Sequence, residues 1–278
     1  MNSVKTVLLL GGMSGFLLLM GETFGGRQGL MLALGGAVLM NFFSYFFSEK
    51  MALSMSGAQR VSDAEHPQIY ARLAPMTERL TQKMGIPMPK LWVLPEESPN
   101  AFATGRNPEH ASVAVSAGLL EVMNDSELEA VVAHELGHVK NRDILISSIA
   151  ATLGAAITGL ARFGMFFGGR RDDDGESRGS GGIFMLFLAP IAALLIQMAV
   201  SRTREYSADA TSAKYTGSPT GLVNALRKLD SWSQRIPMEA APSMSHMYIF
   251  PPLLGGLGRL FSTHPSTEQR IAALLGNR

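Results

Sequence analysis

Two histidines four residues apart, His134 and His138, enclose Glu135 in the segment HELGH. On an α-helix this spacing puts both imidazoles on one face, about one turn apart, so that both can bind one ion. Glu135 lies about 100° further round the helix, where it can reach a metal-bound water without binding the metal. Because the chain has no cysteine, a transition metal has to be held by histidine and carboxylate. The alternative for this motif alone is a surface helix with two histidines.

A catalytic zinc site needs a third protein ligand and an open fourth position. After His138 the chain lacks the glycine and histidine of a metzincin, because Asn141 and Ile144 stand there. Further on, Glu205 and Asp209 are four residues apart and would share a helix face. We expect Glu205 to bind the metal and Asp209 to accept a hydrogen bond from one of the two histidines. Taken alone, this pair is also typical of a solvated acidic face.

A capping box and an apolar repeat predict the helix that carries the two histidines. Ser126 and Glu129 fit the capping-box pattern, in which each side chain bonds a backbone amide of the first turn. Apolar residues at helical spacing follow, namely Val131, Val132, Leu136 and Val139. We therefore place His134 and His138 on one helix.

Four apolar stretches approach the roughly 20 residues that a helix needs to cross a membrane. They are residues 6–21, 29–47, 144–161 and 183–200. The first also resembles a signal peptide, but no cleavage site follows it. The last two are rich in Ala and Gly and also fit a buried hairpin of a soluble domain. A charged fraction of 17%, against about 25% in ordinary globular proteins, favours the membrane.

The basic residues near the first two stretches predict their orientation. Arg27 is the one basic residue of the loop 22–28, whereas Lys5 precedes the first stretch and Lys50 and Arg60 follow the second. Because basic residues concentrate on the cytoplasmic side, both ends of this hairpin are predicted to be cytoplasmic.

The apolar stretches divide the chain into four expected parts. These are an N-terminal transmembrane hairpin (1–48), a first polar part with the HELGH helix (49–143), a second transmembrane hairpin with a flexible loop at 168–182 (144–200), and a second polar part with the third ligand (201–278). Two crossings between His138 and Glu205 would return the chain to its starting face. Both residues would then lie within about 10 Å of one membrane surface, whereas a single crossing would separate them.

The polar parts predict a small sheet flanked by helices. Residues 69–83 have helical periodicity and stop at Gly85, and strands are expected at residues 90–94, 100–105 and 111–116. The expected fold class is an α-helical integral membrane protein with a mainly helical α+β domain. A net charge of +1 gives no reason to expect a nucleic-acid partner.

Together these motifs resemble the HtpX family of bacterial heat-shock membrane metalloproteases. That family is related to the type I CAAX prenyl proteases within the gluzincin group. The similarity runs through nearly the whole chain and, besides HELGH, includes residues 99–106, 113–120, 138–143, 201–209 and 263–265. We could not match residues 168–182 or the Met-rich stretch 237–252, so any regulation that they carry is open.

The resemblance implies a gluzincin-type protease with one zinc ion per chain. The implied ligands are His134, His138 and Glu205, with Glu135 as the catalytic residue. The implied activity is proteolysis of misfolded or damaged membrane proteins at the cytoplasmic face of the bacterial inner membrane, as part of stress response and protein quality control. Its implied partners are unfolded membrane-protein substrates and the lipid bilayer.

The chemistry expected of such a site is hydrolysis of a peptide bond. Zinc lowers the pKa of a bound water towards about 7, Glu135 takes the proton, and a proton then returns to the leaving amine. Two alternatives remain at this point. One is a non-catalytic membrane protein that uses zinc only to hold its helices together, and the other is a processing peptidase with one dedicated substrate class.

Two further features have weaker support. An edge strand that pairs with extended substrates is one interpretation of Asn100, Ala101, Phe102 and Ala103, and an interior strand is the other. By the same resemblance, His264 would stabilise the oxyanion as a distal histidine does in related gluzincins, whereas the sequence alone slightly favours a structural loop histidine before Pro265. The remaining histidines, His66, His110 and His246, are expected at the surface.

Overall fold

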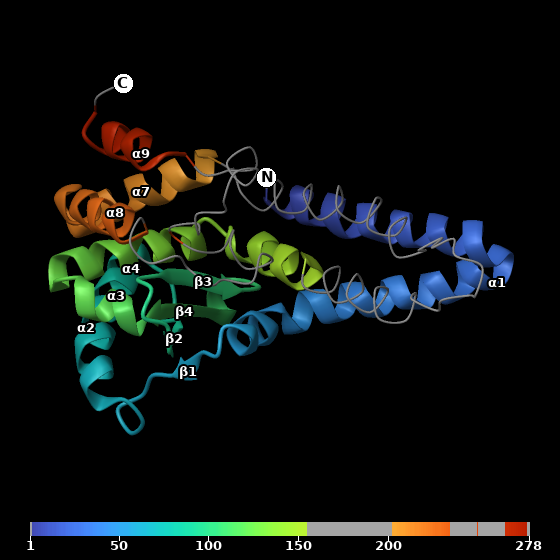
Figure 1. Cartoon of the computed structure of the whole chain (residues 1–278), viewed down its shortest axis with the longest axis horizontal. Coiled ribbons are helices and arrows are strands. Elements are labelled where there is room, and N and C mark those ends of the chain that lie inside the picture. The colour runs from blue at the N-terminus through green and yellow to red at the C-terminus, as the bar shows by residue number, and fades with distance from the viewer. Residues whose placement is uncertain (1, 155–201, 234–248, 250–264, 277–278) are drawn as a thin grey trace, which may run out of the picture.

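The computed structural model describes residues 2–154, 202–233, 249 and 265–276. Several predicted features lie outside these residues, namely the loop 168–182, the apolar stretch 183–200, His246, His264 and all of the Met-rich stretch except Ile249. Figure 1 shows two parts: a domain of helices around a small sheet, and a long helical hairpin, α1, that projects from it.

The sheet has four strands in the order β1-β2-β4-β3. Their bounds are Gln59–Arg60 (β1), Lys90–Leu94 (β2), Ala101–Gly105 (β3) and Ala111–Ser116 (β4). Strands β2 and β4 are parallel, and the outer pairs are antiparallel. Strands thus form at all three places that the β-branched and apolar runs predict. Every residue of β3 and β4 is buried, because helices cover the sheet.

Helices pack around this sheet, with α4 at the centre (Figure 1). Their bounds are Pro67–Met84 (α2), Ala117–Val122 (α3), Asp125–Lys140 (α4), Arg202–Thr216 (α7), Thr220–Ser233 (α8) and Thr267–Leu274 (α9). Helix α4 packs against α7, α8, α2 and β3. Helix α2 ends as predicted, because Gly85 adopts the left-handed conformation (φ 68°) that favours glycine.

The predicted capping box of α4 is wrong by two residues. Asn124 is the N-cap: its side chain accepts from the Glu127 amide, and the Glu127 carboxylate accepts from the Asn124 amide. Ser126 instead donates to Asn124 Oδ1, and Glu129 pairs with Arg79. Asparagine caps a helix as well as serine does, so the sequence contains two overlapping capping-box patterns. The pattern with Asn124 forms because Glu127, its second member, is buried and pairs with Lys228.

Helix α1 (Asn2–Met55) consists of two arms joined at Gly26, whose backbone (φ 54°, ψ −145°) no other residue adopts easily. The arms contact each other, for example through a 3.0 Å hydrogen bond from Asn41 Nδ2 to Ser14 Oγ. Segments 6–23 and 25–55 are long and apolar enough to cross a membrane, and only 17% and 11% of their apolar windows are buried. A core helix of a soluble protein would bury far more, so both arms fit the bilayer.

The helix Ile144–Gly154 follows the HELGH helix and packs against the α1 hairpin. Ile146, Ile149 and Leu153 form a buried cluster with Leu9 and Met13 of the first arm. This helix is the described part of the third predicted span, and the rest of that span lies outside the described residues. Two of the four expected spans lie wholly within the described residues.

Candidate metal centre

Helix α4 brings His134, Glu135 and His138 into the interior of the domain. His134 is completely buried and Glu135 is 2% exposed, while the side chain of His138 keeps 17% of its surface accessible. The surface-helix alternative is therefore wrong. Such polar groups are buried at a high free-energy cost unless each has a partner, so their partners define what the site can hold.

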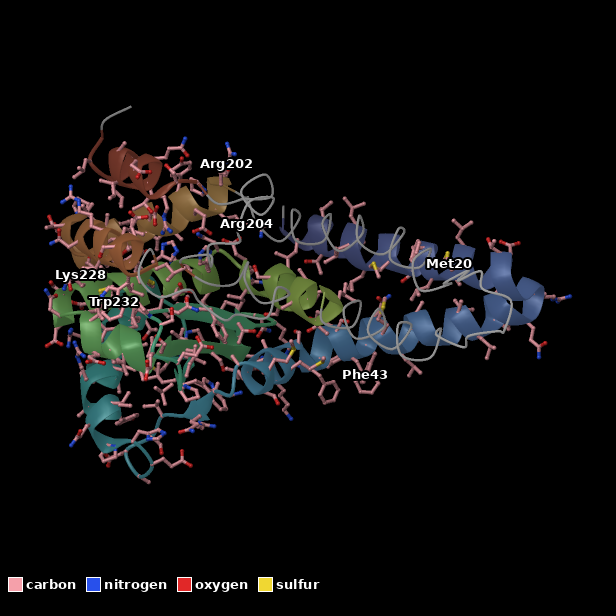
Figure 2. The ribbon with its side chains drawn as sticks, viewed as in Figure 1. Met20, Phe43, Arg202, Arg204, Lys228 and Trp232 are labelled. Atoms are coloured by element: carbon pink, nitrogen blue, oxygen red, sulfur yellow. The ribbon has the colours of Figure 1, made fainter. Side chains whose placement is uncertain are left out.

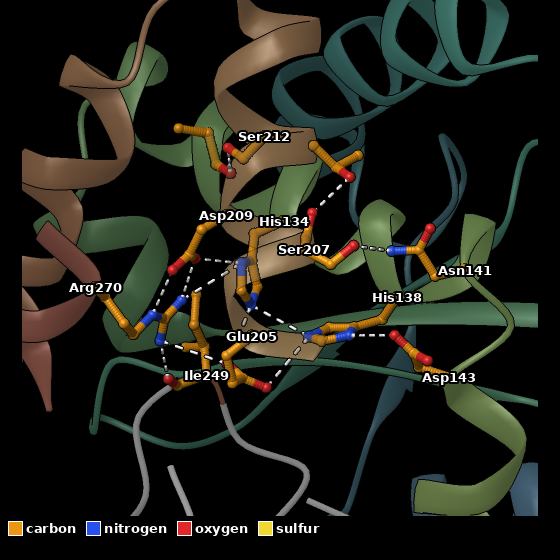
Figure 3. A network of polar contacts seen from close by, with 12 residues as sticks. His134, His138, Asn141, Asp143, Glu205, Ser207, Asp209, Ser212, Ile249 and Arg270 are labelled. Carbon is orange, nitrogen blue, oxygen red and sulfur yellow. Dashed lines mark hydrogen bonds and ion pairs between the residues drawn. The ribbon is translucent and has the colours of Figure 1, made fainter. Parts of the chain in front are cut away.

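Helix α7 lies directly against α4 and carries the two predicted acids. Gly137 allows this approach, because a Cβ there would lie 3.2 Å from Ala208 Cα. Glu205 and Asp209 are 7% and 2% exposed and face α4 (Figure 3), so they are not a solvated acidic face.

Three side chains converge on one point between these helices: His134, His138 and Glu205. The two Nε2 atoms are 3.3 Å apart, and each lies 3.7 Å from a Glu205 carboxylate oxygen. Two atoms bound about 2.1 Å from a tetrahedral zinc are themselves about 3.4 Å apart. The donor set and its spacing therefore fit one zinc ion.

Each ligand histidine is held by its own aspartate on the opposite ring nitrogen. His134 Nδ1 lies 2.9 Å from Asp209 Oδ1, so His134 is the histidine that Asp209 contacts. His138 Nδ1 lies 3.3 Å from Asp143 Oδ2. A carboxylate only accepts, so each Nδ1 carries a proton and each Nε2 is turned to the shared point, where it can offer a lone pair to a metal. Two imidazole nitrogens and a carboxylate that face one point form an arrangement that a cation stabilises, whether the cation is a proton or a metal ion.

Sequence reasoning missed Asp143 and Arg270. Asp143 lies in the stretch 138–143 that carried the family resemblance, five residues after His138, which was the available signal. Arg270, from α9, is 3% exposed and bonds both oxygens of Asp209 at 2.9 and 2.6 Å. It also lies 3.7 Å from Glu205 and donates to the Ile249 carbonyl. Arg270 therefore links helix α9 to Asp209 and Glu205.

The carboxyl of Glu135 is held beside the three ligand atoms without being one of them. Burial, with a smaller contribution from the charge of Glu205, raises the pKa of Glu135 and outweighs the lowering by His134, His138 and a hydrogen bond from the Ala103 amide. A carboxyl with a raised pKa is suited to take up a proton and release it again.

In the absence of a metal, the surroundings of His138 favour its protonated form. Burial acts to lower its pKa, but the hydrogen bond to Asp143 and the charges of Glu205 and Glu135 raise the pKa to about 9. The pocket therefore attracts positive charge, whether from a proton or from a metal ion.

The predicted substrate strand lies next to Glu135. Strand β3 is the last strand of the sheet order, and Asn100 precedes it. Phe102 is fully buried in the core, and the Ala103 amide points to Glu135. The Ala101 carbonyl accepts from the Ile249 amide on the outer edge.

Among the described residues, His66 and His110 are not part of this centre. His110 is exposed and contacts Asn107 and Arg106, and His66 precedes the first turn of α2. The predicted role of His264 stays a prediction, because that residue lies outside the described part of the chain.

Comparison with known proteins gives a consistent match along the chain. Residues 67–278 match the family described as peptidase family M48. A protein called protease HtpX homolog from Desulfatibacillum aliphaticivorans is 52% identical over 283 residues, covering 100% of this chain and 90% of the relative. Another of the same name, from Methylibium petroleiphilum, is 49% identical and covers 99% and 97%.

Among solved structures, the crystal structure of Ste24p from S. mikatae resembles this fold, with a TM-score of 0.50 at 21% sequence identity. The match covers 98% of this chain, and this chain spans 64% of the length of the Ste24p chain. At this identity the likeness concerns the fold alone.

Proposed function

The chain belongs to peptidase family M48, and on that premise we propose that it is a zinc endopeptidase with His134, His138 and Glu205 as ligands. The observation that carries the proposal is the convergence of these three ligand atoms with Glu135 beside them. A bound zinc ion would polarise the peptide carbonyl and acidify a water. Glu135 would take the proton of that water and give a proton to the leaving amine.

We propose that β3 positions the substrate as an added strand. Pairing through the main chain binds extended segments without requiring a particular sequence, which suits unfolded proteins. On this outer edge the Ala103 amide donates to the Glu135 carboxyl, the Gly105 amide donates to Ser148 Oγ and the Ala101 carbonyl accepts from the Ile249 amide. A substrate strand would therefore have to replace Ile249 at the Ala101 carbonyl and Glu135 at the Ala103 amide.

The protein is a membrane protein, and we propose that its catalytic domain faces the cytoplasm of a bacterium. The two apolar arms of α1 and the distribution of basic residues around them support this orientation. We further propose that its substrates are misfolded or damaged membrane proteins. The active site adjoins the helix Ile144–Gly154, which packs on α1, so it lies close to where such proteins leave the bilayer.

Cleavage of unfolded casein by the full-length protein in detergent, with and without a zinc chelator, tests this function. Glu135→Gln should keep zinc bound and lower the cleavage rate at least about 100-fold, because the general base is lost. Glu121→Gln, an exposed acid of α3, is the matched control and should cleave normally. Full activity of Glu135→Gln would refute the assigned role. Failure to cleave any unrelated unfolded chain would favour a dedicated processing peptidase.

A further inference from the structure

The aspartate that holds His138 also pairs with an arginine of α7. Asp143 Oδ2 faces His138 Nδ1 at 3.3 Å, and Asp143 Oδ1 lies 3.8 Å from Arg204 Nε. Asp143 and Arg204 are 3% and 8% exposed, so water screens the pair poorly. Figure 3 shows Asp143 reaching His138, and Figure 2 places Arg204 at the end of α7 nearest the α1 hairpin.

Asp143 and Arg204 each lie next to the end of a helix. Asp143 immediately precedes the apolar helix Ile144–Gly154, which packs on the membrane hairpin. Arg204 is in the first turn of α7, one residue before Glu205. The ion pair therefore joins the point where the chain leaves the domain for this apolar helix to the point where α7 begins.

The charges around the site give this pair a further role. Four buried carboxylates, from Glu135, Asp143, Glu205 and Asp209, surround the two histidines among the described residues. Arg204 and Arg270 place two positive charges beside these four carboxylates, and one divalent cation would bring the net charge of the group to zero. Without Arg204, Asp143 would lose a buried positive charge beside its Oδ1 and would be held less firmly in its place against His138.

We propose that Asp143 and Arg204 form a clasp that positions His138, and thereby couples the zinc site to the placement of helix Ile144–Gly154 against α7. Asp143 fixes the ring orientation of His138 with Nε2 towards the metal, and Arg204 keeps Asp143 in place. A shift of this helix relative to α7 would open the ion pair and release His138. The inference rests on the proposed zinc site.

Zinc affinity, measured by competition with a chromogenic chelator on full-length protein, tests the positioning role. Arg204→Gln should weaken zinc binding about tenfold or more, and Arg204→Lys should restore part of the loss. Arg202→Gln removes an exposed arginine from the same turn of α7 and should bind zinc as the wild type does. Equal affinities of Arg204→Gln and Arg202→Gln would overturn the clasp.

Two readouts separate positioning from a purely structural ion pair. In protein loaded with Co²⁺, the visible absorption should change in Arg204→Gln and Asp143→Asn but not in Arg202→Gln. In the double variant, the zinc affinity should fall by less than the product of the two single effects, because the residues act through one another. Unchanged spectra, or independent effects, would contradict the proposal.

The coupling to the apolar helix has its own test, which needs no zinc. Because the chain has no cysteine, spin labels at Arg142→Cys and Arg202→Cys report only the distance across the clasp. In lipid nanodiscs, adding Arg204→Gln should lengthen or broaden that distance distribution. An unchanged distribution would overturn the clasp even if the protein bound no zinc, whereas absence of zinc from the wild type would refute the proposed zinc site alone.

Discussion

At the scale of single residues, the two ligand histidines differ in how they are held. His134 is fully buried, and its aspartate, Asp209, accepts two hydrogen bonds, from Nε and Nη2 of Arg270. His138 is partly accessible, and its aspartate, Asp143, has a longer contact of 3.8 Å to Arg204. The side of His138 is therefore the more open side of the centre. In the proposed metal centre, water and substrate would reach the metal more easily on this side than beside His134.

Removal of the Arg270 charge should damage both the fold and the site. Arg270→Gln leaves Asp209 as a buried charge without its main partner, so the free energy of unfolding should fall by about 3–5 kcal/mol. Zinc affinity should fall about 10-fold to 100-fold, because Asp209 no longer orients His134 firmly. Denaturant unfolding and chelator competition measure the two effects. Arg227→Gln, an exposed arginine of α8, is the control, and equal behaviour of both variants would contradict this role.

Zinc binding should depend on pH in a predictable direction. The metal-free pKa of His138 is about 9, so a proton has to leave before zinc binds at neutral pH. Apparent zinc affinity should rise about tenfold per pH unit from pH 7 towards 9 and then level off. Titration with a zinc buffer at several pH values measures this slope. An affinity that is constant over that interval would show that His138 is already neutral.

The residues proposed as ligands could be brought together from the sequence, whereas most of the residues that contact them could not be predicted. Periodicity places His134, Glu135 and His138 on one helix and pairs Glu205 with Asp209, because helical spacing is a local property. Arg270 lies on a short amphipathic helix far along the chain. No local pattern separates an arginine that pairs with a buried aspartate from one that faces water.

At the scale of elements, the site depends on how closely α4 and α7 approach. Gly137 faces α7, where an added Cβ would lie 3.2 Å from Ala208 Cα and from Thr211 Cβ. These distances are tighter than ordinary contacts, so a side chain here pushes α7, and Glu205 with it, away from the histidines. The strands and the helix α2 were predictable from local apolar patterns, but this packing distance was not.

Gly137→Ala tests this packing. Overpacking should lower the free energy of unfolding by about 1–3 kcal/mol and weaken zinc binding, since the carboxylate moves relative to both imidazoles. Thr211→Ser removes one of the atoms that the new methyl would meet and keeps the hydroxyl bonded to Ser207, so it should partly rescue Gly137→Ala. Gly137→Ala with wild-type stability and zinc affinity would refute the packing argument.

At the scale of the whole molecule, the catalytic domain is joined to its membrane hairpin through buried contacts. Ala52 and Leu53 at the end of α1 pack with Leu94 and Phe102 of the sheet. The end of the hairpin is therefore anchored in the core of the domain, next to β3. Apolar length predicted both arms, but it could not predict that the end of the second arm enters the core of the domain.

The proposed orientation can be tested with single cysteines, since the natural chain has none. Arg27→Cys, at the turn of α1, should react with a membrane-impermeant maleimide in intact spheroplasts. Asp63→Cys, an exposed residue of the catalytic domain, should react only after the membrane is permeabilised. The reverse pattern would place the active site outside the cytoplasm and contradict the distribution of basic residues.

The most direct test of the central claim is the amount of zinc bound per chain in purified alanine variants of His134, His138 and Glu205. The wild type should hold one zinc ion per chain, and each of the three variants should lose most of it. Glu135→Gln should retain the full amount, because that carboxyl is not a ligand. Unchanged zinc in Glu205→Ala would contradict the third ligand, and with it the proposed metal centre.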